Sequence, residues 1–301
     1  MNNLFKQVSS NWVKYSEYEF RDNGEFLYIT PTPNAKPIIY NPLKNADEMV
    51  VDALNVSLQL TRNIKADVAK SVVLEFVSKY GLLGFMTALP STPHFADYTS
   101  AEPDYDDVYL PKNHFVKAKS VDVDEYIDLF FPFEKVDYIK TYDSVRLNIG
   151  PDRDMMALAL TFEDKPMALQ MSFLRNYAEN YDWLTTQFRD WAFVFLTSFI
   201  YYQDYDKEDK ETLQLYREGM KAFGGIMPTY RIGLFDKPTI IWDFYSLLLC
   251  IQIMFSFALT DENNLLKWCR NCYMAFMAES SDVDLCSKRC VKQYKANKQK
   301  E

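Results

Sequence analysis

The sequence predicts an α+β fold with a mixed amino-terminal body that contains a small sheet, long central helices, and a carboxy-terminal cysteine knuckle of the treble-clef or ribbon type. Strand-like and helix-like segments mix in the first half, an aromatic heptad pattern runs through the second half, and four of the five cysteines fall within the last 33 residues. These patterns divide the chain into residues 1–165, an α+β body; 166–262, a mainly helical part packed on it; and 263–301, the knuckle with a basic tail.

The composition indicates a packed protein with an uneven charge. A hydrophobic content of 48% with 16% aromatic residues is ample for a core in a chain of 301 residues. The net charge of −9 argues against a nucleic-acid coat made by the whole surface. From Asn263 onward, eight basic and four acidic residues give +4, so the preceding residues carry −13. An acidic body with a basic tail is therefore expected.

Periodicity and turn residues place the elements of the first half. Met49, Val50, Ala53, Leu54 and Leu58 recur at helical spacing, and Gly81 is well placed to end a second helix. The proline-rich, acidic segment Leu89–Lys119 is expected to be a long loop with one strand. The expected strands are Glu25–Thr30, Lys36–Tyr40, Ser144–Ile149 and Met155–Phe162, and the expected helices are Asp47–Leu60, Lys65–Tyr80 and Val123–Phe131.

An aromatic seam dominates the second half. Residues seven apart after Pro166, with apolar residues between them, predict one long helix of about ten turns: Leu174, Tyr177, Tyr181, Leu184, Phe188, Trp191, Phe195 and Tyr202. A central core helix is favoured over a coiled-coil dimer seam. Further predictions are a helix at Glu211–Phe223, a hairpin of Tyr230–Leu234 and Thr239–Trp242, and an apolar helix at Phe244–Leu259.

The apolar helix is expected to lie in the core. Its 16 residues fall short of the about 20 needed to cross a bilayer, so no membrane span is predicted. Cys250 lies within it and is interpreted as a core residue. The polar amino terminus, Met1–Tyr15, lacks an apolar signal region, and the cysteines do not form a distributed disulfide framework. A cytoplasmic protein is expected.

The remaining cysteines have the spacing of a metal site. Cys269 and Cys272 form a C-x2-C pair, and Cys286 and Cys290 form a C-x3-C pair thirteen residues later. Two such pairs predict a tetrahedral Zn²⁺ site, because soft thiolates prefer zinc over hard cations. Four protein ligands leave no position for water, so the predicted zinc is structural. Disulfides, idle thiols and an iron–sulfur cluster are the less favoured alternatives.

Basic residues follow the second pair. Ser287 is expected to cap a short helix that carries Cys290 and presents cations to solvent. Such a helix, fixed by zinc, is suited to phosphate contacts with DNA or RNA. The candidate nucleic-acid-binding residues are Lys288, Arg289, Lys292, Lys295 and Lys298. A solvated tail that aids solubility is the alternative.

Roughly the last 55 residues resemble the CGNR zinc-finger proteins of bacteria. The resemblance rests on Leu247–Thr260 running into Leu265–Cys272, then Phe276, Cys286-Ser287 and Arg289-Cys290, and more loosely on Glu75–Gly84. It implies a zinc finger proposed to bind DNA behind an amino-terminal domain of proposed stress-response role. Two positions depart from the pattern: Cys290-Val291-Lys292-Gln293 replaces C-G-N-R, and Tyr273 replaces the usual glycine.

Motifs for catalysis are lacking. His94 and His114 have no metal-ligand spacing, and no GxSxG, P-loop or dinucleotide fingerprint occurs. The acidic residues Asp104, Asp106 and Asp107 lack the spacing of a calcium loop, so a solvated loop is favoured. Those at Asp122, Asp124 and Asp128 are typical of a helix start.

The sequence therefore predicts a cytoplasmic, zinc-containing regulatory or nucleic-acid-binding protein rather than an enzyme. The alternative is a protein-interaction or self-associating module in which zinc only fastens the carboxy terminus. A third possibility, an unrecognised hydrolase, would require carboxylates that converge only in the fold.

Overall fold

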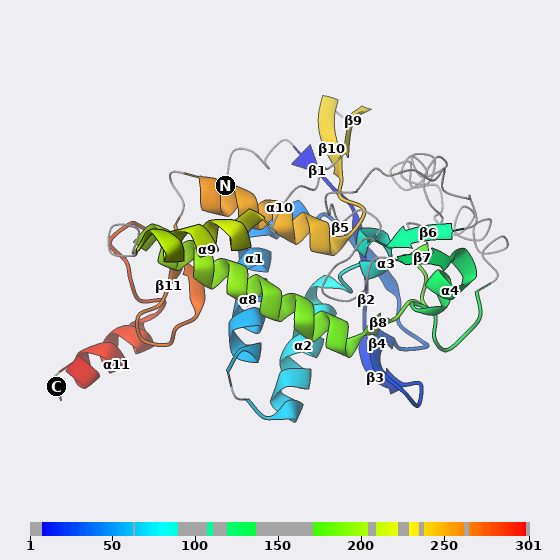
Figure 1. Cartoon of the computed structure of the whole chain (residues 1–301), viewed down its shortest axis with the longest axis horizontal. Coiled ribbons are helices and arrows are strands. Elements are labelled where there is room, and N and C mark those ends of the chain that lie inside the picture. Colours follow the sequence, from blue (N-terminus) through cyan, green and yellow to red (C-terminus); the bar gives the residue numbers. More distant parts are fainter. Residues whose placement is uncertain are drawn as a thin grey trace.

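The computed structural model describes residues 8–62, 64–89, 107–110, 119–136, 171–203, 209–221, 229–234, 238–261 and 265–298 (Figure 1). It confirms the predicted α+β class, with helices, small sheets and a cysteine cluster near the carboxy terminus. The expected strands at 144–149 and 155–162 and both histidines lie outside the described residues.

The described strands form small separate sheets. Their bounds are β1 Val8–Ser9, β2 Trp12–Tyr15, β3 Tyr18–Asp22, β4 Leu27–Pro31, β5 Pro37–Tyr40, β6 Asp107–Leu110, β7 Lys119–Asp122, β8 Glu179–Asn180, β9 Thr229–Leu234, β10 Pro238–Asp243, β11 Leu266–Trp268 and β12 Ala275–Met277. The sheet orders are β1-β10-β9, β3-β4-β8, β2-β5, β6-β7 and β11-β12, and only β1 with β10 is parallel among these pairs.

The strands predicted at Glu25–Thr30 and Lys36–Tyr40 exist as β4 and β5, but they do not pair with each other. β4 pairs with β3 and β8, and β5 pairs with β2. The hairpin predicted near the carboxy-terminal third is confirmed as β9 and β10, with Ile232 opposite Ile240. Its outer face exposes Tyr230, Ile232 and Ile240.

Most of the described helices lie close to their predicted positions. They are α1 Ala46–Leu60, α2 Ala66–Tyr80, α3 Phe85–Ala88, α4 Val123–Asp128, α8 Tyr181–Gln203, α9 Lys210–Lys221, α10 Leu247–Thr260 and α11 Lys288–Lys298. Gly81 ends α2 with a positive φ of 94°, as expected for a glycine at that position.

The long aromatic helix begins later than predicted. Leu174 and Tyr177 lie in turns that precede β8, and α8 begins at Tyr181 and has 23 residues. Asn180 sets this start, because its side-chain oxygen accepts hydrogen bonds from the N–H groups of Asp182 (2.9 Å) and Trp183 (3.2 Å). The seam within the helix is confirmed. Its buried members belong to the chain's own core, and they are Leu184, Phe188, Trp191 and Phe195.

α1 lies at the centre of the molecule. It packs against α2, α8, α10 and the late strand β12 (Figure 1). One hydrophobic core contains residues from distant parts of the chain, for example Leu54, Phe188, Leu248 and Ala275. The apolar helix α10 is buried within it and Cys250 is a core residue, as predicted. No helix among the described residues has the length and apolarity needed to cross a membrane.

A buried carboxylate organises the loop after α2. Glu179 is fully buried and accepts hydrogen bonds from the N–H groups of Leu83 (2.8 Å), Gly84 (2.5 Å) and Phe85 (2.9 Å), and from the Tyr177 hydroxyl (2.7 Å). A buried charge is costly unless it is hydrogen-bonded, and these four donors offset much of that cost. The result is a firm connection between β8 and the start of α3.

Candidate metal centre and basic helix

The first cysteine pair lies in the turn of a short hairpin. β11 and β12 pair from Leu266 opposite Met277 to Trp268 opposite Ala275. The Cys269 N–H donates to the Met274 carbonyl, and the Tyr273 N–H donates to the Cys269 carbonyl, both at 2.9 Å. These bonds curl the turn so that both thiols face the same side.

Tyr273 takes an unusual backbone conformation in this turn. Its φ is +57°, in the left-handed region where a non-glycine residue costs about 1–2 kcal/mol. Glycine is the residue for which that conformation is least costly.

The second cysteine pair lies at the start of α11. Cys286 precedes the helix and Cys290 is in its first turn. The Ser287 hydroxyl accepts a hydrogen bond from the Cys290 N–H at 3.2 Å, which confirms the predicted cap. A hairpin knuckle followed by a helix that begins between the two cysteines of the second pair is the treble-clef arrangement rather than an all-strand ribbon.

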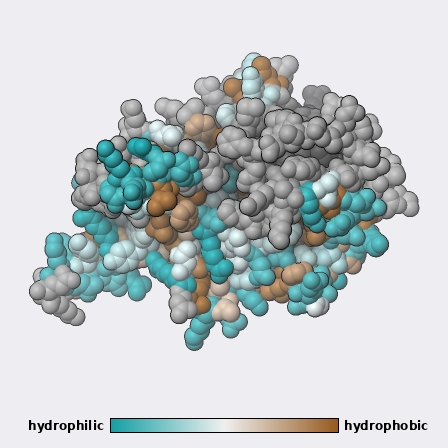
Figure 2. Space-filling model, viewed as in Figure 1, coloured by the Kyte–Doolittle hydropathy of each residue, from teal (hydrophilic) through white to brown (hydrophobic). Residues whose placement is uncertain are grey.

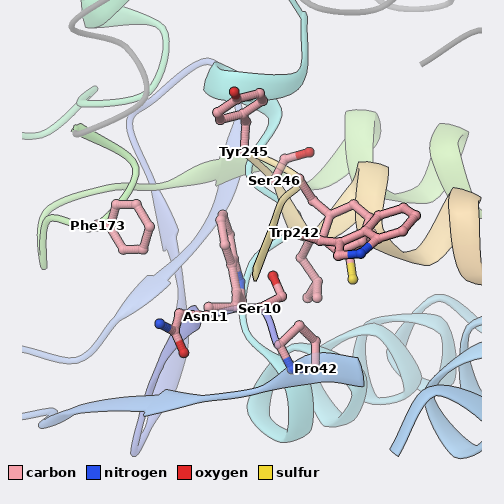
Figure 3. Close-up of a pocket in the computed structure, with 11 residues that line it drawn as sticks. Ser10, Asn11, Pro42, Phe173, Trp242, Tyr245 and Ser246 are labelled. Atoms are coloured by element: carbon pink, nitrogen blue, oxygen red, sulfur yellow. The ribbon is translucent and has the colours of Figure 1, made fainter. Parts of the chain in front are cut away.

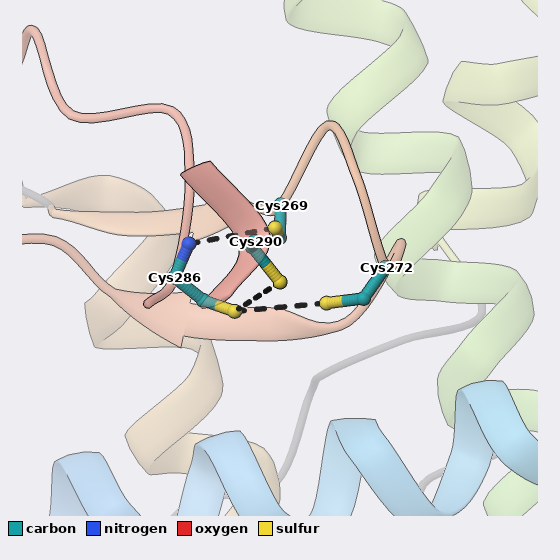
Figure 4. Close-up of side chains that lie close together, drawn as sticks. All are labelled: Cys269, Cys272, Cys286 and Cys290. Atoms are coloured by element: carbon teal, nitrogen blue, oxygen red, sulfur yellow. Dashed lines mark hydrogen bonds between the residues drawn. The ribbon is translucent and has the colours of Figure 1, made fainter. Parts of the chain in front are cut away.

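All four cluster sulfurs converge on one point (Figure 4). They lie within 4.8 Å of one another, and Cys286 is 3.6 Å from Cys272 and 3.5 Å from Cys290, measured between Sγ atoms. A disulfide would require about 2.05 Å, and all these cysteines are free. Sulfurs at about 2.3 Å from a tetrahedral metal ion would be about 3.8 Å apart. The cluster therefore has the dimensions of a four-thiolate metal site.

Hydrogen bonds give this cluster partial thiolate character. Burial disfavours ionisation of Cys269, but N–H donors from Cys272, Cys286 and Asn271 outweigh it and lower its pKa to about 6. The bond from the Cys286 N–H to Cys269 Sγ is 3.4 Å long. Burial and the adjacent thiols raise the pKa of Cys286 to about 12. Four sulfurs this close resist ionising together, and a bound cation would relieve that repulsion.

The knuckle is attached to the body by side chains of α1 and the residues after it. Asn55 forms two bonds with Ala275: its Nδ2 donates to the carbonyl (3.1 Å), and its Oδ1 accepts from the N–H (2.8 Å). Arg62 donates from Nη2 to the carbonyls of Cys272 (3.0 Å) and Tyr273 (2.9 Å). The hairpin that carries the first cysteine pair is thus hydrogen-bonded to α1 and to the residues that follow it.

Other bonds fix the two cysteine pairs relative to each other. Arg270 forms an ion pair with Asp284 at 2.9 Å and donates its N–H to the Asp284 carbonyl at 3.1 Å. Asn271 donates from Nδ2 to Gln293 Oε1 of α11 at 3.0 Å. These contacts join the knuckle turn to the segment before Cys286 and to the helix after it.

The predicted basic residues all lie on α11, which extends away from the rest of the molecule (Figure 1). With about 3.6 residues per turn, Lys288, Lys292 and Lys295 share one face and the buried Cys290 faces the opposite way. Within the described part of the chain, none of the five predicted cations forms an ion pair. The described surface of α11 is hydrophilic (Figure 2).

Among the described residues, the acidic candidates do not join a cluster of potential metal ligands. Asp122 caps α4 by accepting from the N–H groups of Asp124 (2.9 Å) and Glu125 (3.4 Å), as its predicted role at a helix start requires. Asp104 and Asp106 lie outside the described residues, and Asp107 begins β6. Over the described ranges, the four cysteines are the group of potential ligands close enough to share a metal ion.

Two cavities lined by described residues of the body are candidate ligand sites. One is lined by aromatic and small polar side chains, including Trp242 and Tyr245, and its volume of about 20 Å³ has room for about one water (Figure 3). A larger hollow of about 230 Å³ lies near β3 and β4. Its charged lining residues are Glu19, Glu134, Arg21 and Arg175. The two signs balance there, so the hollow has no excess charge to attract an ion.

The chain matches no family model, no curated protein and no solved structure. Function must therefore be inferred from the residues themselves. The sequence pattern located the four cysteines and the basic helix, but it gave no signal for Asn55, Arg62 or Glu179. Each of these acts on a partner that is distant in sequence.

Proposed function

We propose that the four cysteines bind one structural zinc ion and that the helix it fixes, α11, contacts the phosphates of a nucleic acid. Thiolate sulfur is a soft ligand, and a closed set of four cysteines is typical of structural zinc. Free, ionisable thiols need a reducing compartment, which supports a cytoplasmic location. The resemblance to CGNR fingers suggests the same kind of role.

One observation carries the nucleic-acid proposal: the face of α11 opposite Cys290 is basic and has no ion-pair partner among the described residues. Anchoring through Cys290 fixes the direction in which Lys292 and Lys295 point. Cations held in a row without carboxylate partners favour a polyanion. The acidic body would repel that polyanion, so contact is restricted to this end of the molecule.

Two of the basic residues of α11 lie close to the metal ligands in the sequence. A zinc ion with four thiolates carries a net charge of −2, and Lys288 and Arg289 flank the ligands Cys286 and Cys290. These two cations would therefore stabilise the loaded metal centre as well. Lys292, Lys295 and Lys298 follow in the next turns of the helix and are better suited to test phosphate contacts.

The test is a salt titration of binding to labelled random duplex and single-stranded oligonucleotides, with the zinc-loaded full-length protein. Each phosphate neutralised contributes about 0.7–0.9 to the slope of log affinity against log salt. We expect the double variant Lys292→Glu, Lys295→Glu to lower both affinity and slope. The matched control is Lys36→Glu, Lys65→Glu, which makes the same charge change at exposed sites of the body. The absence of binding by the unaltered protein at low salt would refute the nucleic-acid proposal.

A second function is favoured by the contacts of Asn55 and Arg62: zinc fastens the carboxy terminus to the core. Both side chains bond the backbone of the knuckle, and Ala275 belongs to the common core. In that case metal removal would loosen β12 against α1 even if no nucleic acid binds. Hydrogen exchange with and without metal measures this coupling independently of the titration.

A further inference from the structure

We infer that Tyr273 stacks on an unpaired base, so that the nucleic acid bound at this end of the molecule is single-stranded. The inference rests on the proposed phosphate contacts of α11 and adds to them a residue outside the basic helix. It assigns a direct ligand contact to the turn of the first cysteine pair.

The Tyr273 ring is presented to solvent. Its exposed fraction is 57%, whereas the neighbouring Cys269 and Ala275 are buried. The ring contacts Trp268 edge to face with 6.2 Å between centroids, which limits its rotation while most of it stays accessible. An aromatic ring with restricted orientation is suited to stacking.

The backbone conformation at this position does not favour an aromatic side chain. The φ of +57° favours glycine, so tyrosine makes the turn less stable than the simplest alternative would. The strained backbone is held from both sides, by the bond to the Cys269 carbonyl and by Arg62 on the Tyr273 carbonyl at 2.9 Å. A side chain kept in a strained, exposed position is more readily explained by a ligand than by packing.

The tyrosine turn lies beside the basic helix. Asn271, two residues before Tyr273, bonds to Gln293, which is one turn beyond Arg289 on α11. Gln293 and Arg289 share one side of α11, so a bound strand can place a phosphate against Arg289 and a base against the ring. In a duplex the base faces are covered by their neighbours, whereas unpaired bases offer a face to an aromatic residue.

The experiment compares single-stranded and duplex oligonucleotides of the same sequence by fluorescence anisotropy, using zinc-loaded full-length protein. We expect tighter binding to the single strand. Tyr273→Phe should retain it, and Tyr273→Gly should weaken it by roughly 5- to 150-fold, since one stacked base contributes about that factor. The same glycine variant should keep its zinc and unfold at an equal or higher temperature, because the backbone strain is relieved. A merely structural tyrosine would not give these opposite signs.

Two further variants sharpen the outcome. Tyr273→Leu keeps an apolar side chain without a π face and should bind like Tyr273→Gly. Tyr230→Gly removes an exposed tyrosine from the β9–β10 hairpin and should change nothing. The inference is overturned if duplex binds as tightly as single strand, or if Tyr273→Leu binds single strands like the unaltered protein. Failure of every oligonucleotide to bind at low salt would instead refute the phosphate contacts of α11.

Discussion

Cys286 is exposed, while Cys269 and Cys290 of the same cluster are buried and Cys250 lies in the core. Once the metal is removed, we expect a thiol-alkylating reagent to modify the cysteines of the cluster before Cys250. Burial raises the pKa of Cys250 well above its usual value, so little thiolate is available there. Mass spectrometry of the labelled peptides over time gives the order. Early labelling of Cys250 would contradict the buried position of α10.

Glu179 provides a test of buried hydrogen bonding. Glu179→Ala would leave the N–H groups of Leu83, Gly84 and Phe85 buried without their partner. At about 1–3 kcal/mol for each, the free energy of unfolding should fall by at least about 3 kcal/mol, measured by urea denaturation. Glu19→Ala on β3 is the control, since this half-exposed residue should change the value by less than about 0.5 kcal/mol.

The same carboxylate should make stability depend on pH. Burial raises the pKa of Glu179 above its ordinary value of 4.5, against the opposing effect of its hydrogen bonds. Between the unfolded and folded pKa values the folded state binds more protons, so the free energy of unfolding falls as pH rises through this interval. Glu179→Gln cannot ionise and should lack this component. Denaturation of both proteins from about pH 4 to pH 8 compares the slopes.

At the residue scale, the sequence was sufficient where chemistry is encoded by local spacing. The pairs C-x2-C and C-x3-C identified the cluster, and Ser287 beside Cys290 identified the cap. Asn55 could not be found in this way, because its partner Ala275 is 220 residues away and is contacted through backbone atoms of no particular residue type. The same reason applies to Arg62 and Glu179.

At the element scale, helices with one apolar face were predicted closely, for example α1 and α2. The start of α8 was wrong because Leu174 and Tyr177 continue the heptad spacing. Tyr177 is buried for a different reason: it lies beside Phe130 and donates to Glu179. Tyr177, which is buried by tertiary contacts outside the helix, thus fell by its spacing into the heptad pattern of α8. Strand pairing was not predicted, since β4 and β5 carry no local signal for their partners.

The junction between α1 and β12 yields a prediction for an element. Asn55→Ala removes both bonds to the backbone of buried Ala275, so we expect the free energy of unfolding to fall by about 2 kcal/mol or more. Hydrogen exchange in residues 266–277 should accelerate while metal stays bound. Gln59→Ala, on the same helix, loses only a bond to the Asn55 carbonyl and serves as control. Equal effects of the two variants would contradict the proposed junction.

At the scale of the molecule, we expect removal of the metal to affect the cysteine knuckle and α11 but not the hydrophobic core. Chelation, or Cys286→Ser, should release the proposed zinc ion and increase hydrogen exchange throughout α11, because the helix is fixed by Cys290 and few body contacts. α8 and α10 should keep their protection, since their seam lies in the common core. Global loss of helical circular dichroism would show that the knuckle is required by the whole fold.

The central position of α1 has a consequence for biosynthesis. α1 is synthesised before the helices α8 and α10 and the strand β12, which cover it and follow it by more than a hundred residues in the chain. At a translation rate of about 5–20 residues per second, the nascent chain would expose the apolar face of α1 for roughly 10–40 s before β12 is synthesised. The final packing around α1 can therefore form only after β12 has been synthesised, and the ribosome-bound intermediate is a natural client for chaperones.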